Sequence, residues 1–165
     1  MQSRFYGLLL VCSIVAMSCD SNQVFDQYQS IPDQWHKDSV KVFNVKAPDT
    51  MKPYNLFVNI RNTNDYKYNN LFLIVSMNHP NGKVVKDTLE YKMAASNGAL
   101  LGSGFSDLKE NKLWYKGHDE PFVFNESGSY SIAIQHAMRG IGKVEGDDYL
   151  NGITDIGFRI EHTQN

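Results

Sequence analysis

Short segments in which apolar and polar residues alternate constrain the fold of this chain more than any other feature. Residues 55–61 place Leu56, Val58 and Ile60 on one face of a strand, because successive side chains of a strand point to opposite faces. Residues 71–77 are apolar almost throughout, which is typical of a central strand. The same reasoning predicts further strands across residues 40–45, 83–91, 112–116, 121–124, 129–138 and 154–161.

Turn signals separate these segments and set the fold class. Asn81-Gly82 predicts a tight hairpin between two of the strands. Because no long amphipathic helix lies between the segments, we expect an all-β fold. The expected domain is a single antiparallel β-sandwich, jelly-roll or immunoglobulin-like, over residues 39–165. Residues 93–111 are rich in Gly, Ser and Ala, and we expect a long loop there.

The start of the chain predicts export and lipidation. After Arg4, residues 6–17 are apolar and carry no formal charge. A run of roughly a dozen residues is too short to span a bilayer, which needs about 20, but it matches the apolar region of a signal peptide. The string Ala16-Met17-Ser18-Cys19 then predicts a lipoprotein signal peptide over residues 1–18 and a lipidated Cys19. The alternatives are an ordinary signal peptide cut nearby, or a buried N-terminal helix.

Residues 19–38 are polar with scattered aromatic residues, and we expect a lipidated tether that continues as a docked N-terminal segment. Phe25, Tyr28, Ile31 and Trp35 would anchor it to the domain. With one cysteine in the signal peptide and Cys19 acylated, the mature chain has no free thiol, no disulfide and no cysteine-based metal site.

Charge and histidine spacing exclude further classes. The chain has 16 Lys and Arg against 18 Asp and Glu, and loss of residues 1–18 removes Arg4 and no acid, which makes the formal net charge −3. Nucleic-acid binding requires clustered basic residues, so we expect none. No pair among the five histidines has the i+2 or i+4 spacing of metal ligands, so we expect no metal and no cofactor.

Catalytic patterns are weak. Paired carboxylates hydrolyse glycosides, and Asp107, Glu110, Asp119 and Glu120 supply acids, but their loop context favours a solvated rim. Residues 102–104, Gly-Ser-Gly, lack the frame of a phosphate-binding loop or a nucleophile elbow. We therefore expect no enzyme, and we keep a hydrolase as a third hypothesis.

Aromatic residues offer a second hypothesis, a glycan-binding module of the envelope. Trp114, Tyr115 and Tyr66 are the candidate ligand or partner face, because exposed aromatic rings stack on the apolar faces of sugars. The alternative is that these rings pack in the core or at its rim.

A series of short strings runs along the mature chain at residues 19–20, 25–28, 35–38, 52–57, 59–62, 66, 70–73, 80–83, 87–91, 102–104, 107–110 and 152–161. In this order and spacing, the strings together resemble the gliding-motility lipoprotein GldH family of Bacteroidetes over essentially the whole mature chain. Ala16, where leucine is usual, is the one departure.

The resemblance implies a non-catalytic cell-envelope lipoprotein that supports surface gliding, a movement linked in these bacteria to type IX secretion machinery. It supplies Cys19 as the one functional position and no cofactor. The implied partners are a membrane, through the lipid anchor, and other gliding or secretion proteins of the envelope.

Two further expectations concern the exported chain. Residues 20–23 lack the acidic run that sends many such lipoproteins to the cell surface, so we expect the domain to face the periplasm. Asp-Ser/Thr strings followed by an apolar residue are O-glycosylation candidates in this phylum, and they occur at Ser39, Thr50 and Thr88.

Overall fold

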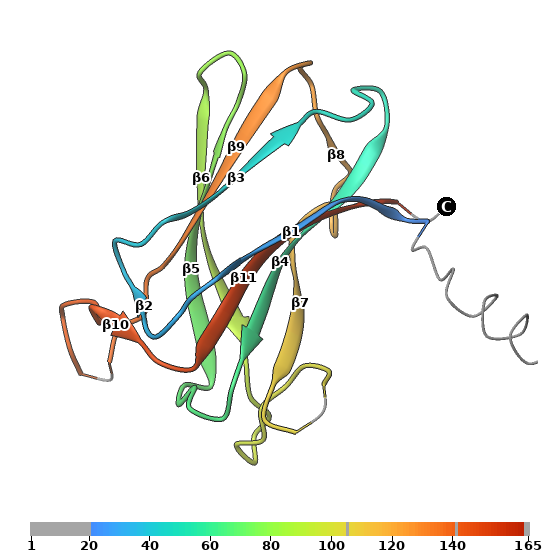
Figure 1. Cartoon of the computed structure of the whole chain (residues 1–165). Helices are drawn as coiled ribbons and strands as arrows, with labels where there is room; N and C mark the ends of the chain where they lie inside the picture. The colour runs from blue at the N-terminus through green and yellow to red at the C-terminus, as the bar shows by residue number, and fades with distance from the viewer. Residues whose placement is uncertain (1–20, 105, 141, 164–165) are drawn as a thin grey trace, which may run out of the picture.

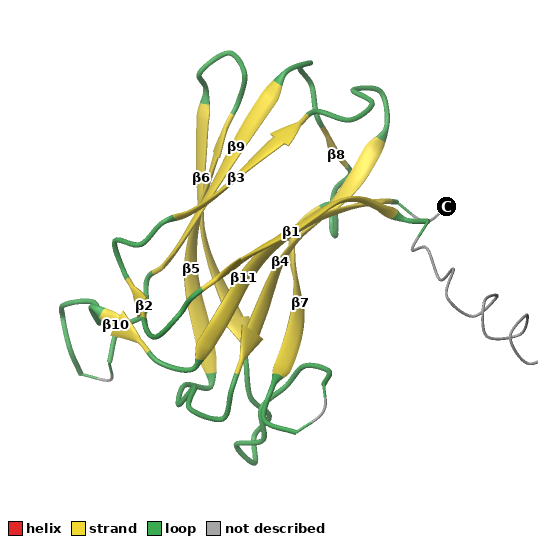
Figure 2. Cartoon of the chain, in the orientation of Figure 1, coloured by secondary structure: helices red, strands yellow, loops and turns green. Residues whose placement is uncertain are grey.

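The computed structural model describes residues 21–104, 106–140 and 142–163 (Figure 1). The predicted signal peptide and Cys19 lie outside these residues. Every regular element in the described part of the chain is a β-strand (Figure 2), so no helix there is long and apolar enough to cross a membrane. Eleven strands are present: β1 (Gln23–Ser30), β2 (Trp35–His36), β3 (Lys41–Lys46), β4 (Pro53–Asn62), β5 (Asn70–Asn78), β6 (Val84–Lys92), β7 (Lys109–Lys116), β8 (Phe122–Val123), β9 (Ser129–His136), β10 (Tyr149–Leu150) and β11 (Ile153–His162).

The eight long strands form two antiparallel four-stranded sheets that face each other. The first sheet has the order β1-β11-β4-β7, with the short β8 also paired to β4, and the second has the order β3-β9-β5-β6. Among the strands of the described residues, only β5 and β6 are consecutive and paired as a hairpin. Between the other long strands, the chain passes from one sheet to the other. This is the strand order of a jelly roll, which confirms the predicted fold class and selects one of its two expected forms.

The predicted strands are confirmed, and the predicted hairpin at Asn81-Gly82 joins β5 to β6. The first sheet, however, begins at Gln23, inside the segment that the sequence suggested as tether and docked segment. Residues 23–30 pair with β11 along nearly their whole length, so this segment is an edge strand of the sandwich. The described residues between 93 and 108 contain no strand, and two isolated bridges join Ala94 to Leu100 and Ser103 to Glu110.

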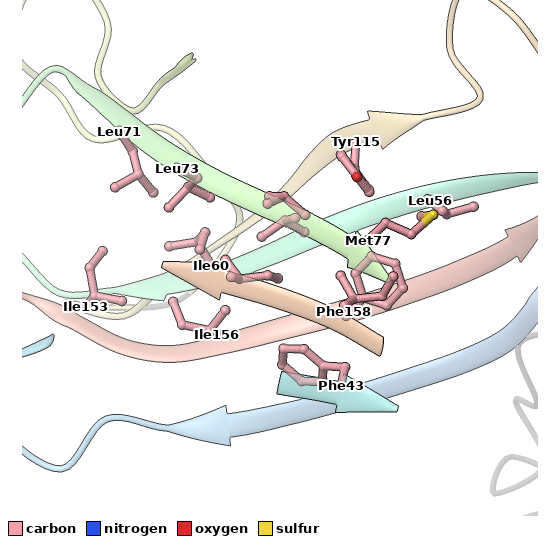
Figure 3. Packing of buried hydrophobic residues seen from close by; sticks show 14 of the residues in the cluster. Phe43, Leu56, Ile60, Leu71, Leu73, Met77, Tyr115, Ile153, Ile156 and Phe158 are labelled. Atoms are coloured by element: carbon pink, nitrogen blue, oxygen red, sulfur yellow. The ribbon is translucent and has the colours of Figure 1, made fainter. Parts of the chain in front are cut away.

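The core lies between the two sheets and follows from strand alternation. On β5, Leu71, Leu73, Val75 and Met77 point inward and are fully buried, while the residues between them point outward. Phe158 of β11 is central (Figure 3): its ring centroid lies 6.2 Å from those of Phe25 and Phe43 and 6.4 Å from that of Tyr115. Each buried side chain of this size contributes roughly 1.5–3 kcal/mol relative to exposure.

Side chains close the two long edges of the sandwich. Tyr91 of β6 donates a hydrogen bond to the Trp114 carbonyl of β7 at 2.7 Å, and the Lys116 ammonium of β7 lies 2.9 Å from the Asp87 carboxylate of β6. At the opposite edge Gln29 of β1 donates to the Val42 carbonyl of β3 at 2.6 Å. The second sheet packs only on the inner face of the first sheet, so it does not cover the outer face of the first sheet.

Candidate functional site

Of the three aromatic residues predicted as a ligand face, the structure exposes only Trp114. Its side chain is on the outer face of β7 and the residue is 40% exposed, whereas Tyr115, the next residue, points inward and is 8% exposed. Tyr66 is 3% exposed, and its hydroxyl donates to the Asn70 carbonyl. The expectation that all three form one surface is therefore wrong, because alternation along β7 sends Tyr115 into the core and the loop after β4 buries Tyr66.

The four predicted acids are also separated. Glu110 is at the start of β7, whereas Asp119 and Glu120 follow its end, beside a groove of about 560 Å³. An eight-residue strand spans roughly 26 Å, so Glu110 lies far from that groove. The Asp107 carboxylate accepts a hydrogen bond from Asn64 at 2.9 Å.

The three candidate O-glycosylation positions differ in exposure. Ser39 and Thr88 are exposed, Thr88 on the outward side of β6, and Thr50 is half-buried in the loop before β4. Glycosylation of these residues remains a prediction.

A polar network, which the sequence did not reveal, crosses the outer face of the first sheet. Tyr28 of β1 extends over Gly157 of β11, and its hydroxyl donates to the Glu110 carboxylate of β7 at 2.8 Å. Arg61 of β4 donates to the same carboxylate at 2.9 Å, and its guanidinium lies 4.1 Å from the centre of the Tyr28 ring. Four neighbouring strands thus hold one network.

The network fixes the protonation state of its members. Burial and the hydrogen bond to Glu110 raise the pKa of Tyr28, so the phenol stays protonated and donates. Burial alone would raise the pKa of Glu110, but hydrogen bonds from Tyr28 and Arg61 outweigh it and lower that pKa. The carboxylate is therefore ionised at neutral pH, and the Arg61 pair is a charged hydrogen bond.

A cavity of about 190 Å³ lies beside this network. The Arg159 guanidinium pairs there with Asp26 at 2.6 Å, and the Lys112 ammonium pairs with Glu161 at 2.6 Å. Asn59 also lines the cavity; the residue is 2% exposed, and its amide nitrogen donates to the Tyr28 hydroxyl at 2.9 Å. Two buried oxygens, Oδ1 of Asn59 and Oδ1 of Asp26, have no hydrogen-bond partner among the described residues, which is costly for buried polar atoms.

A wider groove of about 500 Å³ adjoins the cavity and shares Lys112 and Glu161 with it. Trp114 forms one wall; its ring centroid is 4.4 Å from that of Phe57 beneath it and 5.0 Å from that of His118 at its side. The Lys112 ammonium lies 4.1 Å from the centre of the Phe57 ring. The sequence signal for this groove was the single residue Trp114, and its polar neighbours come from β4, β7 and β11.

The described residues contain no group of three or more His, Cys, Asp or Glu side chains placed to hold a metal ion. The arrangement on the outer face is instead one of paired charges, two unpaired acceptors and an exposed aromatic ring.

Comparison with known proteins defines the class. Residues 23–160 match the model of the GldH lipoprotein family. The chain is 51% identical over 166 residues to the "Gliding motility lipoprotein GldH homolog" of Christiangramia forsetii, covering 100% of both chains. It is 49% identical over 161 residues to the "Gliding motility lipoprotein GldH" of Flavobacterium johnsoniae, covering 98% of both. The chain therefore belongs to the GldH lipoprotein family, as the sequence resemblance implied.

Similarity to solved structures is weaker. A chain of infectious bursal disease virus, Gx strain, aligns over 89% of this chain and 35% of that chain with 14% identity and a TM-score of 0.33. That TM-score is too low to support any conclusion about function.

Proposed function

We propose that this chain is a non-catalytic cell-envelope lipoprotein that supports gliding motility, is anchored in a membrane by lipidated Cys19, and works with type IX secretion machinery. The observation that carries the proposal is the similarity, over the full length of the chain, to two proteins that are named as gliding motility lipoproteins. Its partners are the membrane and other envelope proteins of the gliding or secretion machinery, and its domain faces the periplasm.

The position of the first strand supports a close anchor. Cys19 stands four residues before Gln23, where β1 begins. Four residues span at most about 14 Å, so a lipid on Cys19 would hold the sandwich near the membrane surface. Stable anchoring requires more than one acyl chain, which a lipoprotein cysteine provides through its diacylglycerol and N-acyl groups.

Substituting the predicted anchor tests the proposal in the source bacterium. In a strain that lacks its own copy of the gene, we expect wild type to restore colony spreading and to sediment with membranes. C19A should move to the soluble fraction and fail to restore spreading, because a domain without the lipid has no membrane anchor. The control is C12A, which removes the other cysteine and should behave as wild type.

Three outcomes would contradict parts of the proposal. A membrane-bound C19A protein would overturn the anchor. A deletion strain that spreads normally would overturn the role in gliding. Unchanged secretion of type IX cargo into the medium by the deletion strain would overturn the link to that machinery.

A further inference from the structure

The first strand and the loop before β4 begin at the same end of the sandwich. β1 and β4 run in the same direction, because each is antiparallel to β11, which lies between them. Gln23 of β1 pairs with Glu161, and Glu161 pairs on its other side with Asn55 of β4, so Gln23 and Asn55 are level in the sheet (Figure 1). Cys19 precedes Gln23 by four residues, and Met51 precedes Asn55 by four residues. The predicted anchor and Met51 therefore extend the sheet from the same end.

The loop before β4 holds Met51 in solvent. Met51 is 86% exposed, and its backbone N–H donates to the Asp49 carboxylate at 2.9 Å. The backbone N–H of Asp49 in turn donates to the Tyr54 hydroxyl at 3.1 Å, and the Lys52 ammonium lies 3.6 Å from the Asp49 carboxylate. An apolar side chain in water forgoes the stabilisation that burial provides. The loop thus presents an apolar side chain on a turn that hydrogen bonds fix in place.

The position of Met51, rather than its exposure, indicates what it contacts. Val144 is equally exposed, at 87%, but it precedes β10, which pairs with β2 after the end of β1, at the opposite end of the sandwich. Neighbouring strands are about 4.8 Å apart, so β1 and β4, on either side of β11, are separated by about 10 Å. The four residues from Cys19 to Gln23 span at most about 14 Å, which matches the reach of the loop beyond the sheet. A lipid on Cys19 would bring a bilayer to the level of Met51.

We propose that Met51 inserts among the lipids of the bilayer that holds Cys19, with Lys46 and Lys52 at the headgroup phosphates. The anchor and the loop are then two contacts with one membrane, and together they set the orientation of the sandwich, which a single flexible attachment does not. This inference deepens the proposed function and rests on the lipidation of Cys19.

The side chains around Met51 suit the boundary between headgroups and acyl chains. Lys46 ends β3 at the same end of the molecule, and in the described part of the chain its ammonium has no ion-pair partner. Lysine stems lie along apolar surface while their ammonium groups stay at the level of phosphate, so Lys46 and Lys52 can flank an inserted residue. Methionine is unbranched and adapts to irregular surroundings, as lipid chains are. The charge of Asp49 is offset by Lys52 and by the Met51 N–H.

A thiol-attached fluorophore tests the proposed contact in the lipidated protein. The mature chain is expected to have no free thiol, so M51C and V144C each introduce one labelling position. Each variant is purified in its lipidated form, labelled with an environment-sensitive dye and reconstituted into vesicles of phosphatidylethanolamine and phosphatidylglycerol. Mass spectrometry checks the lipid on Cys19, and circular dichroism checks the fold.

We expect the dye at position 51 to emit at shorter wavelength, to be quenched by lipids with a nitroxide near the headgroup, and to be shielded from aqueous iodide. The dye at position 144 is the matched control, and it should stay open to iodide and unaffected by the nitroxide lipids. Adding K46E and K52E to M51C should increase quenching by iodide at least about twofold, because glutamates are repelled by anionic headgroups.

The possible failures are distinguishable. Absence of a lipid on Cys19 would overturn the anchor and this inference together. A lipidated protein in which positions 51 and 144 are equally open to iodide would overturn the membrane contact of Met51 alone and leave the proposed function intact. Shielding of position 51 without quenching by nitroxide lipids would also contradict the inference, because the shielding would then come from protein rather than lipid.

Discussion

At the scale of single residues, Gly157 determines whether the outer-face network can form. A Cβ at this position would lie 2.8 Å from Cε1 of the Tyr28 ring and 3.1 Å from Cβ of Asn59. The absent side chain therefore allows Tyr28 to extend across β11 and reach Glu110 two strands further on. In the sequence, Gly157 appears only as a small residue inside an apolar strand.

We predict that G157A lowers the free energy of unfolding by about 1–2 kcal/mol, because the added methyl group displaces the packed Tyr28 ring. Chemical denaturation of wild type and variant measures the change. Alanine also reduces the entropy of the unfolded chain, which would stabilise the protein by about 0.4–1 kcal/mol if no clash existed.

The double variant provides the control for this explanation. In a Y28A background the ring is gone and only the 3.1 Å approach to Asn59 Cβ remains, so G157A should cost clearly less stability than it does in the wild-type background. Equal destabilisation in both backgrounds would show that the cost does not come from Tyr28.

At the scale of elements, His136 at the end of β9 connects the main sandwich to the small ribbon of β2 and β10. Its Nε2 is 2.9 Å from the Trp35 carbonyl and its Nδ1 accepts from the Met138 backbone N–H at 3.4 Å. Its ring centroid is 5.2 Å from that of Trp35. The neutral imidazole with the proton on Nε2 satisfies both contacts, whereas a second proton on Nδ1 would face another N–H group.

Acid should therefore weaken this connection. Burial lowers the pKa of His136, and it outweighs the Trp35 carbonyl and the Asp147 carboxylate, which raise it; His36 and Lys37 lower it further. Below the ordinary histidine pKa of about 6.5 the unfolded chain binds the proton more readily than the folded chain. We predict that the stability due to neutral His136 is complete above about pH 7 and falls by up to about 1.4 kcal/mol per pH unit as the pH drops below about 6.5.

Denaturation curves between pH 8 and pH 5 measure this slope, and H136Q should flatten it while lowering stability at neutral pH. The control is H118Q, because His118 is exposed and should leave the slope as in wild type. The lowered pKa values of Glu110 and Glu161 act below the ordinary glutamate range, about pH 4.5, and so do not contribute in this window. An unchanged slope in H136Q would contradict the assignment.

At the scale of the whole molecule, the jelly roll depends on its first strand. β1 is the edge strand that covers β11, and the chain after it contributes Ile31 and Trp35 to the core. A unit that began at residue 39 would leave one side of β11 unpaired and remove the fully buried Trp35. An exposed strand edge of this kind also favours aggregation.

We predict that a chain of residues 39–165 aggregates or lacks a cooperative melting transition, whereas residues 21–165 give a monodisperse, cooperatively folded protein. Size-exclusion chromatography and circular dichroism on heating distinguish these results. A 39–165 chain with the melting temperature of the longer one would show that β1 is dispensable.

The sequence by itself determined the strands and their inward faces. Alternation in residues such as Leu56, Val58 and Ile60 is a local property, set by the two-residue period of a strand, and turn dipeptides such as Asn81-Gly82 bound the segments. It also supplied the family, through the order of short strings along the chain.

Only the tertiary structure decided which strands pair and how the outer-face groove forms. It also decided which of two neighbouring aromatic residues is exposed to solvent, as with exposed Trp114 and buried Tyr115. Tyr28, Glu110 and Arg61 are distant in sequence and meet because β1, β11, β4 and β7 lie in that order in one sheet. The strand character of β1 was not evident from its sequence, because many of its residues are polar. In the structure, several of these polar side chains form hydrogen bonds to neighbouring strands of the sheet. Long-range pairing has no local signature, and the candidate site depends on it entirely.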